Sequence, residues 1–105
     1  MDKFQVMIPS EKVNISIVDI KLYIQESIES RVRFCVNNYG GSYAWVENGV
    51  YSVKKQGFTR GVHKNPEAIL SILTQLVKRY QNFEYKGYIY TYSGGWNRFK
   101  GQTDL

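Results

Sequence analysis

The chain has little of what a secreted, membrane-bound or metal-binding protein needs. Its 105 residues include one cysteine, Cys35, and one histidine, His63. A single cysteine excludes an internal disulfide and any metal site built from several thiolates. No stretch approaches the roughly 20 apolar residues that span a bilayer, and the first residues lack the apolar segment of a signal peptide. We therefore expect a cytoplasmic protein without a membrane partner.

Acidic residues are scarce in one half of the chain. The whole chain carries 14 Lys and Arg against 9 Asp and Glu, which gives a formal net charge of +5. Residues 1–47 contain five basic and six acidic residues, a sum of −1, whereas residues 48–105 contain nine and three, a sum of +6. This asymmetry favours an anionic partner, although a charged surface also serves solubility alone.

The few residues able to do chemistry are not arranged for catalysis. Cys35 falls in a predicted strand rather than at the start of a helix, where a thiolate would be stabilised. No two acids have the spacing of a metal site or of an acid–base pair. The glycines near residue 60 do not form a nucleotide P-loop, because no Gly-Lys-Ser/Thr element follows them. We expect no enzymatic activity, no metal and no cofactor.

The residues that are abundant predict a folded domain. Hydrophobic residues make up 43% of the chain and aromatic residues 15%, which is too much for a disordered chain. Because no repeat or linker interrupts the sequence, residues 1–105 are expected to form a single domain. Apolar residues alternate over residues 4–8 and predict a first strand.

Residues 16–30 fit two patterns. Isoleucines recur at helical spacing up to Ile28, while a strand-like alternation runs only as far as Gln25. We favour a helix because the helical stripe continues for longer, and because Ser16 and Asp19 resemble a capping box. A strand remains the alternative, since the segment is rich in β-branched residues.

The most specific local signal is Asn48-Gly49, which lies between two β-rich runs and is typical of a two-residue type I′ hairpin. The register that follows places Ala44, Val46, Tyr51 and Val53 on one face, which we predict to be the core face. A preceding strand over residues 31–38 joins this hairpin through an odd-length turn at residues 39–41, which pairs Cys35 with Trp45. The opposite face then carries a set of cations and aromatic rings, called the Trp45 patch below: Arg31, Arg33, Tyr43, Trp45 and Lys54.

A second helix is predicted over residues 65–80. Asn65 serves as its N-cap, Pro66 occupies its first position, and Ile69 and Leu73 belong to its buried stripe. A last strand is expected over residues 85–92. The predicted fold is α+β, with about five antiparallel strands and two helices in the order β-α-β-β-β-α-β. Its middle section, a helix, three strands and a helix, resembles double-stranded RNA-binding domains in topology alone.

Two further segments are candidate binding sites. Residues 54–66, the basic segment, hold Lys54, Lys55, Arg60, His63 and Lys64 without any acid and lead into the second helix, whose N-terminus favours anions. Residues 96–100, the C-terminal segment, hold Trp96, Arg98, Phe99 and Lys100. They follow three tyrosines at period 2, which fit either a stacking platform for bases or packing within the core.

These features favour a non-catalytic module that binds nucleic acid, either RNA or DNA. Cations would contact phosphates, and Trp45, Tyr43 or Trp96 would stack on bases. The alternative is a small protein-interaction module of the phage or mobile-element type that binds a host protein complex, because Tyr, Trp and Arg also anchor protein interfaces. The sequence leaves the oligomeric state open, with a homodimer among the options.

Overall fold

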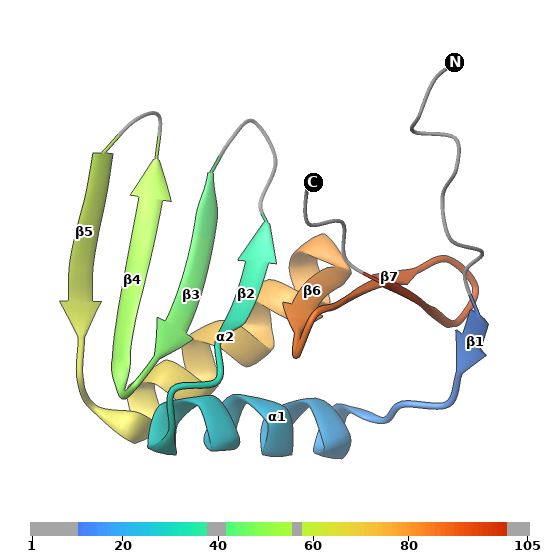
Figure 1. Ribbon diagram of the computed structural model, residues 1–105, viewed down its shortest axis with the longest axis horizontal. Coiled ribbons are helices and arrows are strands. Elements are labelled where there is room, and N and C mark those ends of the chain that lie inside the picture. The colour runs from blue at the N-terminus through green and yellow to red at the C-terminus, as the bar shows by residue number, and fades with distance from the viewer. Residues whose placement is uncertain (1–10, 38–41, 56–57, 101–105) are drawn as a thin grey trace.

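The computed structural model describes residues 11–37, 42–55 and 58–100, with the backbone alone described for residues 58–63. Within these ranges the chain forms two helices and a single antiparallel sheet of eight strands (Figure 1). The strands are β1 (Glu11–Val13), β2 (Phe34–Asn37), β3 (Tyr43–Glu47), β4 (Val50–Lys55), β5 (Phe58–His63), β6 (Asn82–Tyr85), β7 (Tyr88–Tyr92) and β8 (Trp96–Lys100), and the helices are α1 (Ile17–Glu29) and α2 (Pro66–Tyr80).

The α+β class is confirmed, but the sheet has eight strands instead of about five. Across the sheet the order is β1-β8-β7-β6-β2-β3-β4-β5, so the two halves of the chain meet where β6 pairs with β2. The strand predicted over residues 4–8 lies outside the described residues. The short strand β1, which pairs with β8, was not predicted.

The ambiguous segment is the helix α1. The Ser16 hydroxyl accepts a hydrogen bond from the Asp19 backbone N–H at 3.2 Å, and the Ser16 N–H donates to the Asp19 carboxylate at 2.8 Å. This reciprocal pair satisfies donors that a helix start leaves free, and a strand offers no equivalent. Ile20 and Ile24 are fully buried on the inner face of the helix. The helical interpretation of residues 16–30 is therefore confirmed.

Both helices cover the same side of the sheet. They pack against each other, and α2 passes behind strands β2 to β4 in Figure 1. Register places Phe34, Val46 and Tyr51 side by side on adjacent strands, and all three are buried against the helices. The sheet thus has a helix-covered face and a second face without a described helix, which we call the open face.

The hairpin predicted at Asn48-Gly49 has the expected geometry and register. Both residues have positive φ, +53° and +82°, as a type I′ turn requires. Pairing runs from Glu47 opposite Val50 to Tyr43 opposite Lys54. The Asn48 N–H donates to the Ser30 carbonyl at 2.8 Å, so this turn is tied to the end of α1.

The second helix also follows its sequence signals. The Asn65 side chain accepts a hydrogen bond from the Ala68 N–H at 3.0 Å, and Pro66 is the first helical residue. Ile69, Leu73 and Val77 are buried between the helix and the sheet. The helix ends at Gln81, whose left-handed φ of +58° lets its N–H reach the Val77 carbonyl.

The strand predicted over residues 85–92 is a hairpin of two strands. Lys86 and Gly87 form a second turn with positive φ, +52° and +82°, between β6 and β7. Lys-Gly is a weaker turn signal than Asn-Gly, so the alternating tyrosines led to the prediction of one continuous strand. The C-terminal segment is not a tail but the strand β8, which pairs with β7 and β1.

The basic segment is also largely a strand. Residues 58–63 form β5 and pair with β4 along the edge of the sheet, with a register shift at Tyr51/Ser52. The prediction of a glycine loop running into α2 is therefore wrong. Four strands rather than three separate the two helices, so the topology departs from that of double-stranded RNA-binding domains.

Candidate functional site

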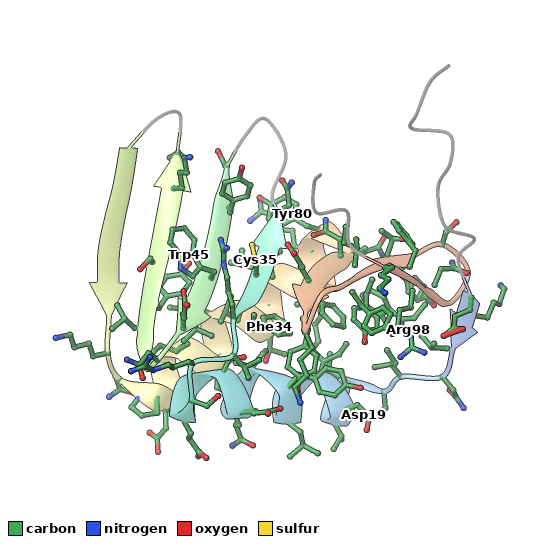
Figure 2. The ribbon with its side chains drawn as sticks, in the orientation of Figure 1. Asp19, Phe34, Cys35, Trp45, Tyr80 and Arg98 are labelled. Carbon is green, nitrogen blue, oxygen red and sulfur yellow. The ribbon has the colours of Figure 1, made fainter. Side chains whose placement is uncertain are left out.

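The open face of the sheet brings the members of the Trp45 patch together. Tyr43 and Trp45 occupy alternate positions of β3, so both side chains stand on the open face. Lys54 lies opposite Tyr43, and Cys35 lies opposite Trp45. Arg31 and Arg33 precede β2 and are exposed. Figure 2 shows Trp45 and Cys35 on neighbouring strands of this face.

Each aromatic ring of the patch is accompanied by a cation. The guanidinium carbon of Arg33 lies 5.1 Å from the centre of the Trp45 ring, and the ammonium of Lys54 lies 5.7 Å from the centre of the Tyr43 ring. These distances are within the range of cation–π attraction. Arg31, Trp45 and Glu47 line an adjoining hollow of about 400 Å³. The patch therefore combines ring faces with positive charge, and two acids, Glu47 and Glu84, lie beside it.

Cys35 is buried although it lies on the open face. Its side chain is 6% exposed, and Arg33 and Trp45 lie beside it. Burial raises the pKa of the Cys35 thiol to about 11, which the nearby Arg33 guanidinium only partly offsets. A protonated thiol is a poor nucleophile at neutral pH. The sequence had placed Cys35 in a strand, as observed, but did not predict its burial.

Trp96 and Arg98 of the C-terminal segment lie on the opposite, helix-covered face. The Trp96 ring meets the Phe83 ring edge-on at 5.2 Å and the Tyr92 ring at 5.3 Å, and it packs against the core. The Arg98 guanidinium is bound by the Glu11 carboxylate and lies 4.7 Å from the centre of the Tyr88 ring. Both side chains are therefore separated from the Trp45 patch by the sheet.

The three tyrosines of β7 have different environments. Tyr90 is buried and stacks on Phe83 at 4.4 Å, whereas Tyr88 and Tyr92 are 36% and 42% exposed. Lys100 is exposed and lies opposite Tyr88 in the register. The central tyrosine is thus a core residue, and the outer two stand at the ends of the same face.

A charged cluster fixes α1 to the β6–β7 turn on the helix-covered face. The Tyr85 hydroxyl donates to the Glu26 carboxylate, whose other oxygen lies 3.2 Å from the Lys86 ammonium. The hydrogen bond from Tyr85 and then that from Lys86 lower the pKa of Glu26. Tyr23 stacks on Tyr85 at 4.4 Å. Because Glu26, Lys86 and Tyr85 all interact with one another, the cluster has a structural role and holds α1 against the β6–β7 turn.

The cations of the basic segment do not converge. Lys54 and Lys55 lie at one end of the β4–β5 hairpin, whereas His63 and Lys64 lie at the other end, beside α2 (Figure 1). The five residue steps of β5 span about 17 Å at roughly 3.4 Å per step. Arg60 lies opposite Val53 within the strand. Because Asn65 and Glu67 sit at the start of α2, that N-terminus already carries a cap and a negative side chain.

Sequence reasoning missed a second hydrophobic area on the open face. Ile89 and Phe99 lie opposite each other on β7 and β8 and share the face of Trp45. The alternation of β8 was the available signal, but its partner strands could be identified only once the β6–β7 turn was known. Phe99 therefore joins the candidate residues of the open face.

Among the side chains that the structure describes, those of residues 11–37, 42–55 and 64–100, no three from His, Cys, Asp and Glu gather as a metal site would require. Within the same ranges, neither helix has the length and apolar character needed to cross a membrane. Comparison with known proteins found no matching family, no matching curated protein and no matching solved structure.

Proposed function

We propose that this domain binds nucleic acid, RNA or DNA, through the Trp45 patch and without catalysis. The observation that carries the proposal is the pair of aromatic rings on one strand of the open face, each with a cation near its ring. Aromatic side chains stack on bases, and neighbouring cations neutralise phosphates. The Arg33 guanidinium plane adds a further surface on which a base can stack.

The charge of the patch supports this choice of partner. Arg31, Arg33 and Lys54 surround the two rings, with Glu47 and Glu84 as the neighbouring acids. The whole chain carries a net charge of +5, which adds long-range attraction for a polyanion. Arg98 is bound to Glu11 on the other face, so the proposal rests on the Trp45 patch and not on the C-terminal segment.

A matched pair of tyrosines tests the stacking role. Tyr43→Ala should weaken binding to a fluorescently labelled single-stranded oligonucleotide by about 1 to 3 kcal/mol, the cost of losing one stacked base. Tyr88→Ala, which removes a partly exposed ring from the opposite face, should leave the affinity unchanged. Fluorescence anisotropy gives both affinities, and thermal melting checks that the variants are folded.

A second pair of variants tests the phosphate role. Lys54→Ala should lower the magnitude of the salt dependence of binding by about 0.7 on a single strand, the value expected for one phosphate contact. Lys78→Ala, an exposed cation of α2, should leave that slope unchanged. If the folded wild type shows no salt-dependent affinity for RNA or DNA near 0.1 M salt, the proposal fails. The rings of the patch would then be assigned to a protein interface.

A further inference from the structure

We infer that the open face takes single-stranded nucleic acid and that the strand runs across the β-strands from Trp45 toward Phe99. This inference rests on the proposed function and adds the form of the ligand and its path. It depends on which side chains the register aligns on the open face, and on the spacing of the two rings in β3.

One row of paired residues crosses the open face from β3 to β8. In register order this row is Trp45, Cys35, Glu84, Ile89 and Phe99. Four strand spacings of about 4.8 Å separate its ends, so Trp45 and Phe99 lie about 19 Å apart along the sheet. Trp45 and Phe99 therefore stand four strands apart on one row of the open face, over which no helix lies among the described residues.

The next row is polar and carries a cation at each end. In register order it runs Lys54, Tyr43, Asn37, Asn82, Thr91, Asn97 and Lys12. The Asn82 amide binds both the backbone N–H and the carbonyl of Asn37, at 3.1 Å each, which holds β2 and β6 in line. Amide and hydroxyl side chains can bind base edges and sugars, while Lys54 and Lys12 favour phosphates.

The spacing of the rings in β3 selects unstacked bases. Side chains two residues apart on a strand are separated by about 6.8 Å, twice the rise of 3.4 Å per nucleotide in a stacked strand. Bases lying on both Tyr43 and Trp45 must therefore leave their own stack. A duplex keeps its base faces inside the helix, so only a single strand can offer them to the rings.

The acid in the row constrains how the strand lies. Glu84 is exposed and stands between Cys35 and Ile89, where it repels phosphates. A carboxylate can accept a hydrogen bond from an exocyclic amine of a base. The geometry therefore directs bases over the row of Trp45 and Glu84, and phosphates toward Arg33 and the Lys54 end of the polar row.

The length dependence of binding tests this path. A 3-nucleotide strand with two bases on Tyr43 and Trp45 extends only about 7 Å beyond Trp45 at the unstacked spacing of about 6.8 Å, whereas a 9-nucleotide strand can cover the distance of about 19 Å to Phe99. Phe99→Leu keeps an apolar side chain but removes the ring. It should weaken binding of the 9-mer by about 5- to 150-fold and leave the 3-mer unchanged. Tyr88→Ala, on the helix-covered face, should alter neither affinity.

The outcomes separate this inference from the proposed function. A duplex of the same sequence that binds as tightly as the single-stranded 9-mer, at the same salt concentration, would overturn the single-strand assignment. If Phe99→Leu leaves the 9-mer affinity unchanged while Tyr43→Ala still weakens binding, the path toward Phe99 is wrong and binding at the Trp45 patch is retained. If neither length binds the wild type, the proposed function itself is wrong and this inference is lost with it.

Discussion

The two type I′ turns of the sheet provide a controlled experiment on how the β3–β4 hairpin is held to α1. Gly49 and Gly87 occupy equivalent positions with the same φ of +82°. A Cβ at Gly49 would lie 3.3 Å from the Ile28 carbonyl oxygen at the end of α1, whereas a Cβ at Gly87 would meet no atom within 4 Å. Substituting either glycine by alanine imposes the same backbone strain, but only the substitution at Gly49 also creates a steric contact.

The expected losses follow from these two terms. A non-glycine residue in the left-handed region costs about 1 to 2 kcal/mol, which should be the whole effect of Gly87→Ala. Gly49→Ala should lose about 1 to 3 kcal/mol more, because the added methyl group must displace the Ile28 carbonyl or the turn. At about 4 to 8 °C per kcal/mol for a domain near this size, Gly49→Ala should melt clearly below Gly87→Ala.

Urea denaturation followed by circular dichroism gives the free energy of unfolding of the wild type and both variants. Equal losses would refute the reasoning about α1, because they would show that the contact between the turn and Ile28 contributes nothing. The absence of any loss would refute the type I′ geometry itself. A larger loss for Gly87→Ala would show that the β6–β7 turn is the more constrained of the two.

Two further outcomes are expected. Leu73→Ala should cost about 2 to 5 kcal/mol in urea denaturation, because Leu73 is fully buried under the sheet. Leu22→Ala, at an exposed site, should cost about 1 kcal/mol or less. Similar losses in the two variants would show that α2 does not belong to the core. Because burial raises the pKa of the Cys35 thiol from about 9 to about 11, the thiol's contribution to stability is complete below pH 9 and is lost as the pH rises to 11, by roughly 2 to 3 kcal/mol at most. Cys35→Ala should flatten that alkaline decline, and parallel declines in the two proteins would contradict it.

Local signals were sufficient wherever a structural element was specified by its own residues. The capping pair of Ser16 and Asp19, the Asn65-Pro66 start of α2 and the Asn48-Gly49 turn all have the predicted geometry. The pairing of Cys35 with Trp45 was predicted because a single core face had to be kept across three strands. These signals also placed Tyr43, Trp45 and Lys54 on the same face.

Errors arose where a strand depended on partners that the local pattern does not reveal. A run of alternating tyrosines predicts one strand, and only the pairing of β6 with β2 and of β7 with β8 shows that the chain reverses direction at Lys86-Gly87. The basic segment lacks helical or strand periodicity strong enough to identify β5, whose formation depends on the edge of β4. Strand formation is decided by such neighbours more than by intrinsic preference.

The sequence by itself determined the α+β class, both helices, the central hairpin with its register, and the chemistry of the Trp45 patch, because caps, turn residues and period-2 alternation act over a few residues. The tertiary structure alone decided that Trp96 and Arg98 lie on the helix-covered face, that Phe99 shares the open face with Trp45, and that the lysines of the basic segment stand at opposite ends of a hairpin. Which face a side chain occupies depends on every pairing between its strand and the centre of the sheet. A single unpredicted turn therefore changes the assignment of all the strands beyond it.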